Sequence, residues 1–156
     1  MKTMKKLLTL SLLALSAGVA SLPAHANDKA TIDAMEGYFE FVDYGGATIF
    51  PEQIPKEDWK KFFVIDARDA GQFDKGHIPG ARNIDWRQVL ARRNEIPKDK
   101  PVLIYCNQGT LSAQAGFALR LAGYENVRIL QGGMSEWQAK GGFDAAQQPT
   151  PLGGKH

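Results

Sequence analysis

Residues 101–112 of this 156-residue chain have the sequence PVLIYCNQGTLS. The apolar run from Pro101 to Tyr105 predicts a buried strand, and Ser112 opens a helix-like run that continues to Ala122. Cys106 therefore falls in a short loop between a strand and the N-terminus of a helix. Backbone N–H groups point outward at such a terminus and the helix dipole favours negative charge, so a thiol there should have a lowered pKa. We predict that Cys106 is a thiolate nucleophile.

The alternative for a lone free cysteine is a small buried apolar residue. The position of Cys106 argues against that alternative, because it follows the carboxyl end of the apolar run, where open α/β sheets bind ligands. It is the only cysteine in the sequence, so the chain cannot form an internal disulfide. An exported protein with one thiol exposes that thiol to oxidation, which favours a chemical use for it.

The first 26 residues are predicted to be a secretory signal peptide. Three lysines precede an apolar run over residues 7–20, and Ala24-His25-Ala26 is a small-x-small cleavage site. The apolar run is too short for a good membrane span. We expect export to a bacterial periplasm, cleavage after about Ala26, and no membrane attachment after cleavage.

Composition and charge argue for one ordinary domain. The whole chain has a formal net charge of +2, but residues 27–156 hold 16 basic and 17 acidic side chains, a net charge of −1. This nearly neutral balance excludes a nucleic-acid-binding surface as the default interpretation. We divide the chain into a signal peptide (1–26), an N-terminal helical extension (27–45), one main domain (46–143) and a flexible tail (144–156).

Strand-like and helix-like runs alternate along the main domain. Strands are expected at 47–50, 62–65, 102–105 and 127–130, helices at 55–61, 86–93, 112–122 and 134–140, and a turn with a short helix over 67–74. The alternation predicts an α/β fold, with an open parallel sheet of about five strands and helices on both faces. A further helix over 27–44 carries an apolar stripe that either packs over the domain or forms a dimer contact or a lid.

Several motifs together resemble the rhodanese family. Asp66-Ala67-Arg68, the segment GHIPGA at 76–81, the Cys106 loop and the later glycine pair at 132–133 occur in that order. The resemblance covers about Gly46 to Gly142, most of the chain after the leader. It implies a small, single-domain, exported bacterial sulfurtransferase of the thiosulfate:cyanide class. In that chemistry a cysteine takes a sulfane sulfur from a donor and passes it on as a persulfide.

The loop after the cysteine is the expected binding site for the anionic sulfur. Its backbone N–H groups can wrap that sulfur as a nest. The residues assigned to it are Asn107, Gln108, Gly109, Thr110, Leu111 and Ser112. This chemistry calls for no metal or organic cofactor, and the histidine positions suggest no metal site. The expected partners are a small sulfur-containing substrate and a possible sulfur-acceptor protein, not nucleic acid.

Residues outside the loop have expected roles in the site or in the fold. Asp66 and Arg68, at a neighbouring strand end, either orient the loop or assist the substrate, or they form a buried structural ion pair. His77 is expected to brace a turn through hydrogen bonds rather than act as a base. Trp137 is expected in the core. Trp86 and its neighbour Arg87 are candidates for the rim of the site.

One loop position departs from the family pattern. Many rhodaneses carry an arginine five residues after the cysteine, and this chain has Leu111 there. Losing a charge-assisted contact costs about 1.5–3 kcal/mol, or roughly tenfold to a hundredfold in binding. We therefore predict weak thiosulfate affinity and consider a persulfide or polysulfide as the donor.

The same loop bears on two alternative functions. A phosphatase of related fold needs a Cys-x5-Arg loop, and Ser112 occupies the arginine position, so a phosphoryl transition state would lack its cationic clamp. The other alternative, a persulfide carrier or sulfur-relay module without turnover, stays open.

Overall fold

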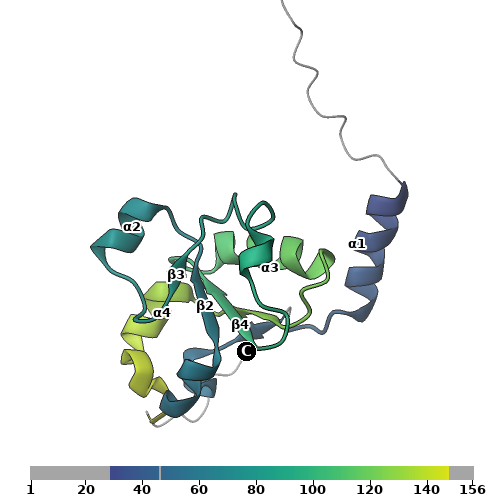
Figure 1. Cartoon of the computed structure of the whole chain (residues 1–156). Helices are drawn as coiled ribbons and strands as arrows, with labels where there is room; N and C mark the ends of the chain where they lie inside the picture. Colours follow the sequence, from purple (N-terminus) through teal and green to yellow (C-terminus); the bar gives the residue numbers. More distant parts are fainter. Residues whose placement is uncertain (1–28, 46, 148–156) are drawn as a thin grey trace, which may run out of the picture.

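The computed structural model describes residues 29–45 and 47–147 (Figure 1). The α-helices are α1 (Lys29–Phe41), α2 (Ala70–Lys75), α3 (Thr110–Leu121) and α4 (Gly133–Ala139). The 3-10 helices are η1 (Pro51–Gln53), η2 (Lys56–Lys61), η3 (Arg93–Glu95) and η4 (Gly142–Gln147). The strands are β1 (Thr48–Ile49), β2 (Phe63–Asp66), β3 (Arg82–Asn83), β4 (Val102–Tyr105) and β5 (Val127–Leu130). The predicted signal peptide lies outside the described residues.

The five strands form one parallel sheet in the order β1-β5-β4-β2-β3. The strand that precedes Cys106, β4, is central, and Val102 pairs with Phe63 on one side and Val127 on the other. The predicted parallel α/β sheet is confirmed. Its fifth strand, β3, has only two residues, and the sequence analysis did not locate it.

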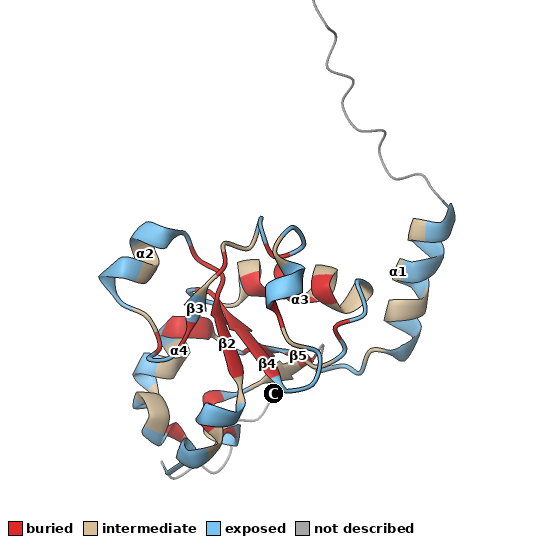
Figure 2. Ribbon diagram, in the orientation of Figure 1, coloured by how far each residue is buried: buried red, intermediate tan, exposed pale blue. Residues whose placement is uncertain are grey.

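Two apolar clusters cover the two faces of the sheet. Alternate residues of β4 point to opposite faces, so Val102 and Ile104 join one cluster while Leu103 and Tyr105 join the other. The first cluster includes Ala115 and Leu119 of α3, and the second includes Trp59 of η2 and Met134 of α4. Figure 2 shows the buried residues concentrated in the central strands. The all-apolar sequence of β4 follows from this burial on both faces.

The helix predicted over 86–93 is wrong. Residues 86–92 form turns, followed by η3. The N–H of Trp86 donates to the carbonyl of Ala67 at 3.0 Å, and the Asp85 carboxylate accepts from the N–H of Arg87 at 3.0 Å. These bonds tie the start of the segment to the end of β2 and to a local side chain. The backbone bonds that follow are separate turns, from the Gln88 N–H to the Asp85 carbonyl at 2.7 Å and from the Arg92 N–H to the Gln88 carbonyl at 2.9 Å, so the segment has no continuous helical ladder.

The N-terminal helix α1 packs only loosely on the domain. It has no buried residue, and Ile32 of the predicted stripe is 42% exposed. Its contact with α3 is aromatic, with the rings of Tyr38 and Phe39 at 4.9 and 5.8 Å from the Phe117 ring. Figure 1 shows α1 at the periphery of the molecule, beside the end of α3. Among the described helices, none has the length and apolar content that crossing a membrane requires.

Packed structure continues past residue 143, where the sequence analysis ended the main domain. In η4, Ala145 is 1% exposed and Asp144 pairs with Lys56 at 2.8 Å. The start of the expected flexible tail therefore belongs to the packed structure as far as these contacts reach.

Candidate active site

The Cys106 loop turns sharply between β4 and α3. Gly109 is the N-cap of α3 and has φ 109°, a backbone conformation that favours glycine. The helix begins at Thr110, two residues earlier than predicted. This turn brings the Gly109 N–H to 3.2 Å from the Sγ of Cys106. The Ser112 hydroxyl lies 3.6 Å from the same sulfur and 3.0 Å from the Gly109 carbonyl, so its single proton can serve either acceptor.

The surroundings of Cys106 favour a thiolate. Burial, which leaves the residue 3% exposed, raises the pKa of the thiol. Hydrogen bonds from the backbone and hydroxyl of Ser112 and from the amides of Gln108 and Gly109 outweigh burial, and the net result is a lowered pKa. The sulfur is therefore buried, as in the inert alternative, but donors that stabilise its charged form surround it, as predicted for this loop.

The start of α4 holds the Cys106 loop through backbone hydrogen bonds. The Cys106 carbonyl accepts from the Met134 N–H at 2.8 Å, and the Asn107 carbonyl accepts from the Ser135 N–H at 3.0 Å. Gly133 has φ 57°, and a Cβ atom there would collide with the Cys106 carbonyl oxygen. Only glycine allows α4 to approach the Cys106 loop this closely. This is why the second residue of the glycine pair at 132–133 must lack a side chain.

Asp66 and Arg68 form a buried, two-pronged ion pair. The Nε and Nη2 atoms of Arg68 donate to Oδ1 and Oδ2 of Asp66 at 2.9 and 2.6 Å. The Tyr105 hydroxyl donates to the same carboxylate at 2.7 Å and accepts from the Ile78 N–H at 3.0 Å. The hydrogen bond to Asp66 raises the pKa of Arg68, which keeps the guanidinium charged. The sequence analysis placed Tyr105 in the strand and missed this polar role, because an apolar run hides a single hydroxyl.

The ion pair also reaches the loop, so Arg68 both forms the buried pair and contacts a loop residue. Nη1 of Arg68 donates to Oδ1 of Asn107 at 3.3 Å, and Nη2 donates to the Gly76 carbonyl at 2.7 Å. Nδ2 of Asn107 donates to Oε1 of Gln72 at 2.7 Å. Gln72, in α2, was not predicted, and no feature of the sequence marks it.

The remaining predicted residues lie as follows. Nδ1 of His77 is 2.9 Å from the Phe73 carbonyl and its ring stacks on the Phe73 ring at 3.8 Å, as expected of a brace. Trp137 packs against the second apolar cluster. Trp86 and Arg87 line a pocket beside α3, and Asp85 holds Arg87 through two bonds of 3.1 Å.

Cations are scarce around the loop. Leu111 is half-buried in the first turn of α3. Within 29–45 and 47–147, Arg68 is the only cationic side chain that bonds to a loop residue, and Asp66 neutralises it. No cluster of three or more His, Cys, Asp or Glu side chains in these ranges could hold a metal ion.

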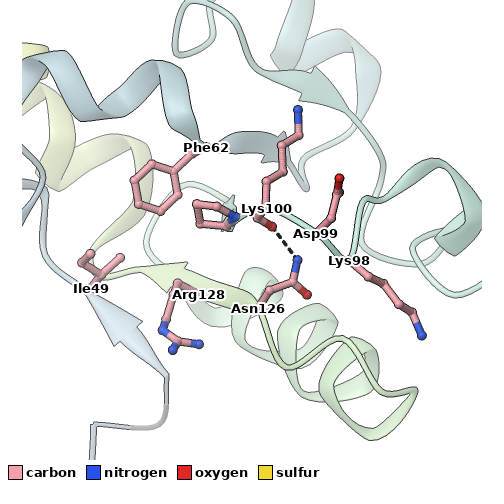
Figure 3. A pocket seen from close by; sticks show the side chains of 8 residues that line it. Ile49, Phe62, Lys98, Asp99, Lys100, Asn126 and Arg128 are labelled. Carbon is pink, nitrogen blue, oxygen red and sulfur yellow. Dashed lines mark hydrogen bonds between the residues drawn. The ribbon is translucent and has the colours of Figure 1, made fainter.

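A pocket of about 440 Å³ lies far from Cys106, at the amino ends of the strands (Figure 3). Phe62, Pro101 and Asn126, which immediately precede β2, β4 and β5, line it. The ammonium groups of Lys98 and Lys100 point away from each other in Figure 3, so they do not converge on one anion. The pocket has no part in chemistry at the sulfur, because it lies at the amino ends of the strands and Cys106 lies at their carboxyl ends.

Comparisons with known proteins agree with this geometry. Residues 48–140 match the family described as Rhodanese-like domain. The "Uncharacterized protein YqhL" of Bacillus subtilis is 42% identical over 89 residues, which cover 57% of this chain and 71% of that protein. A protein named "Sulfurtransferase" from Allochromatium vinosum is 36% identical over 84 residues, 54% of this chain and 78% of that protein.

Solved structures and longer relatives extend the comparison. The crystal structure of a rhodanese-related protein from Thermoplasma volcanium has a TM-score of 0.56 and 25% identity, and covers 61% of this chain and 93% of that one. The chain spans only 24% of the length of "Probable adenylyltransferase/sulfurtransferase MoeZ" from Mycobacterium tuberculosis, to which it is 34% identical over 98 residues.

Proposed function

Because this chain belongs to the rhodanese-like domain family, we propose that it moves a sulfane sulfur from a donor to a thiophilic acceptor through a persulfide on Cys106. One observation carries the proposal. The Sγ of Cys106 accepts the Gly109 N–H at 3.2 Å at the start of α3, inside a ring of donors that lowers its pKa. These donors stabilise an anionic sulfur. Cys106 is such an anion both as the thiolate before loading and as the persulfide after it.

The first half-reaction loads the cysteine. The thiolate of Cys106 attacks the outer sulfur of thiosulfate or of a persulfide or polysulfide. A new S–S bond forms, the donor's S–S bond breaks, and its electron pair leaves with sulfite or with the donor's thiolate. The resulting persulfide is anionic, so the amides of Gln108 and Gly109 that held the thiolate can also hold its terminal sulfur.

The second half-reaction unloads it. Cyanide or a thiolate attacks the terminal sulfur, the persulfide S–S bond breaks, and its electron pair returns to the Sγ of Cys106. No proton transfer by a general base is needed, because both nucleophiles react as anions. Two half-reactions through a covalent intermediate require ping-pong kinetics.

We assign thiosulfate a secondary place among the donors. Thiosulfate carries two negative charges, and the loop offers it Leu111 where an arginine fork would pair with a sulfonate-like group. Arg68, the cation bonded to the loop, already pairs with Asp66 at 2.6 Å. A persulfide or polysulfide with lower charge needs less compensation and suits this loop better.

A persulfide carrier is the second candidate function, and the burial of the sulfur favours it. Cys106 is 3% exposed, so a persulfide built on it would be shielded from small thiols in solvent. Such a carrier would deliver its sulfur only to a partner protein that engages the loop. Its signature is a stable persulfide with negligible turnover toward cyanide or small thiols.

We also propose that the chain works in the periplasm after removal of residues 1–26. The proposal rests on the lysine-rich start, the short apolar run and the Ala24-His25-Ala26 site. Mass analysis of the full-length gene product expressed in a bacterium, after separation of periplasm from cytoplasm, tests it. A periplasmic form that begins at Asn27 is expected, and a cytoplasmic form that retains the leader would contradict it.

A donor-by-acceptor panel tests the main proposal. Purified protein is treated with thiosulfate or a polysulfide and its mass measured, and a gain of about 32 Da per sulfur atom is expected. Subsequent addition of cyanide should remove the added mass and release thiocyanate. Cys106→Ala should neither gain mass nor turn over. A wild-type chain that gains no mass with any donor would disprove the proposal.

A further inference from the structure

A pocket of about 490 Å³ lies between the turns over residues 86–90 and the middle of α3. Trp86, Leu90 and Phe117 are its large side chains. Leu90 is 44% exposed, so its side chain is accessible from solvent. The two polar residues in the lining are Arg87 and Gln114. The lining is therefore predominantly apolar, as in sites that bind small organic molecules.

The pocket begins one helical turn beyond the start of α3, where the active loop ends. Gln114 follows Thr110 by one helical turn and its Nε2 donates to the Thr110 carbonyl at 3.4 Å. Phe117 and Ala118 continue the same helix face. Gln114 is five residues beyond Gly109, whose N–H contacts the sulfur, so the near end of the pocket lies about 7.5 Å along the helix axis from the loop and its far end, at Ala118, about 13 Å.

Backbone bonds place the second wall of the pocket, the turns that begin at Trp86, beside the carboxyl ends of β2 and β4. The Trp86 N–H donates to the Ala67 carbonyl at 3.0 Å, and the Ala67 N–H donates to the Tyr105 carbonyl at 2.7 Å. Tyr105 is the residue before Cys106, so Trp86 stands two hydrogen-bonded steps, roughly 10 Å, from the strand that presents the sulfur. Both walls therefore begin beside the active loop.

The charges of this region disfavour a small, strongly anionic donor. Arg87 is the pocket's one cation, and Asp85 engages it through Nε and Nη2. Its guanidinium also lies over the Trp86 ring at 5.9 Å. An apolar wall next to a loop without a free cation suits a substrate that binds through its carbon skeleton.

We propose that this pocket is a substrate subsite that binds the apolar body of the sulfur donor. The donor would carry its sulfane sulfur on a flexible arm long enough to span the distance from the pocket to Cys106. This inference rests on the proposed function, because it assigns the donor class of the same site. Apolar-bodied persulfides and thiosulfonates are the chemical class that fits.

A thiosulfonate anion serves as the probe, because its reaction is simple and balanced. The Cys106 thiolate attacks the outer sulfur, a Cys106 S–S bond forms, and the donor's S–S bond breaks. The electron pair leaves with the sulfinate, so no other oxidant or reductant takes part. Methanethiosulfonate and phenylbutanethiosulfonate share this chemistry and charge and differ in the apolar arm.

The experiment compares the rates at which the two donors load Cys106, measured by mass. The wild-type protein should react at least about tenfold faster with the phenylbutyl donor, as burial of a phenyl group allows. Leu90→Glu introduces a carboxylate into the apolar lining and should reduce this ratio to less than about threefold. Leu90→Ala, which only shortens the side chain, should give an intermediate ratio.

Ile32→Glu is the matched control. Ile32 is 42% exposed, like Leu90, but lies in α1 and does not line the pocket, so its substitution should keep the wild-type ratio. Equal rates for the two donors in the wild type, or the same ratio in Leu90→Glu as in the wild type, would overturn the subsite while leaving sulfur transfer intact. If neither thiosulfonate loads Cys106 but a polysulfide does, the subsite is wrong and the proposed function stands; if a polysulfide and thiosulfate fail as well, both are wrong.

Discussion

Arg68 donates from Nη1 to Oδ1 of Asn107 at 3.3 Å, which joins a buried ion pair to the residue that follows the nucleophile. The other guanidinium atoms of Arg68 bind Asp66, so the side chain cannot also neutralise a substrate anion without breaking that pair. Its place in the structure is that of a positioning residue. The loop conformation that surrounds Cys106 with amides is thereby coupled to packing on the second face of the sheet, where Tyr105 meets the same carboxylate.

Substitution of Arg68 by methionine should destabilise the fold severely. Asp66 is fully buried, and removal of its partner leaves a carboxylate whose burial is no longer compensated. Loss of one member of a buried pair costs about 3–5 kcal/mol. Urea denaturation should show a correspondingly lower free energy of unfolding for Arg68→Met.

The exposed pair of Arg87 and Asp85 provides the control for that measurement. The Arg87 side chain is 67% exposed, so Arg87→Met removes an ion pair that water already screens and should change stability only slightly. A similar loss of stability in the two variants would show that burial of the Asp66–Arg68 pair has no special weight.

Introduction of arginine at position 111 should strengthen thiosulfate binding. Leu111 is half-buried in the first turn of α3, close enough to the loop for a long side chain to reach an anion above it. A new charge-assisted contact stabilises binding by about 1.5–3 kcal/mol, so the thiosulfate KM of Leu111→Arg should fall roughly tenfold to a hundredfold. Steady-state kinetics with cyanide as acceptor measure it.

Leu111→Met keeps the volume and lacks the charge, so it should retain the wild-type KM. A thiosulfate KM in the wild type as low as that of Leu111→Arg would mean that loop amides alone compensate the donor's charge.

Alanine at position 133 should disturb both stability and the active loop. Gly133 has φ 57°, and the added Cβ would meet the Cys106 carbonyl oxygen and the Asn107 backbone. Strain of this kind costs about 1–3 kcal/mol from the backbone alone, and the collision adds to it. Thermal unfolding should report a lower Tm, and the surviving folded protein should load sulfur more slowly.

Gly37→Ala is the opposite case in the same chain. Gly37 lies inside α1 with no atom within 4 Å of its would-be Cβ, so alanine there should leave the domain unharmed and favour the helix by about 0.5–1 kcal/mol. If Gly133→Ala proved as harmless as Gly37→Ala, the close approach of α4 to the loop would be without consequence.

The reactivity of Cys106 should depend on pH with a midpoint below that of an ordinary thiol. Burial raises its pKa, but the donors of Ser112, Gln108 and Gly109 lower it further than burial raises it. Alkylation by iodoacetamide across a pH series reports the midpoint. Ser112→Ala removes the hydroxyl 3.6 Å from the sulfur and should move the midpoint upward.

The same shift predicts how stability depends on pH. A thiol whose pKa is lower in the folded than in the unfolded chain stabilises the fold fully above the unfolded value, and that contribution disappears as the pH falls through the folded value. The stability advantage of wild type over Cys106→Ala should therefore increase from neutral to alkaline pH.

Ser135→Ala is the control for the alkylation midpoint of Cys106. It removes a neighbouring exposed hydroxyl and keeps the backbone bond to Asn107, so the midpoint should not move. An upward shift of the midpoint in Ser135→Ala equal to that in Ser112→Ala would contradict the role assigned to Ser112.

Local sequence patterns were sufficient for the main elements of the fold. The runs at 62–65, 102–105 and 127–130 became β2, β4 and β5 within one residue. The runs at 62–65 and 102–105 are wholly apolar because β2 and β4 are buried on both faces, whereas β5 exposes Arg128. The 86–93 segment forms turns and η3 instead of the predicted helix. Its bond from the Trp86 N–H to the Ala67 carbonyl joins it to the end of β2, a contact that no local pattern reveals.

The nucleophile and its loop could be read from residues that are neighbours along the chain. A strand, a cysteine, a turn with glycine and a helix start are separated by a few residues, so their chemistry is encoded locally. The supports of the loop are not local. Tyr105 and Asp66 are 39 positions apart, as are Asn107 and Arg68, and each pair meets because β2 and β4 are adjacent and in register. Such contacts depend on strand order and register, which emerge only when the whole sheet assembles.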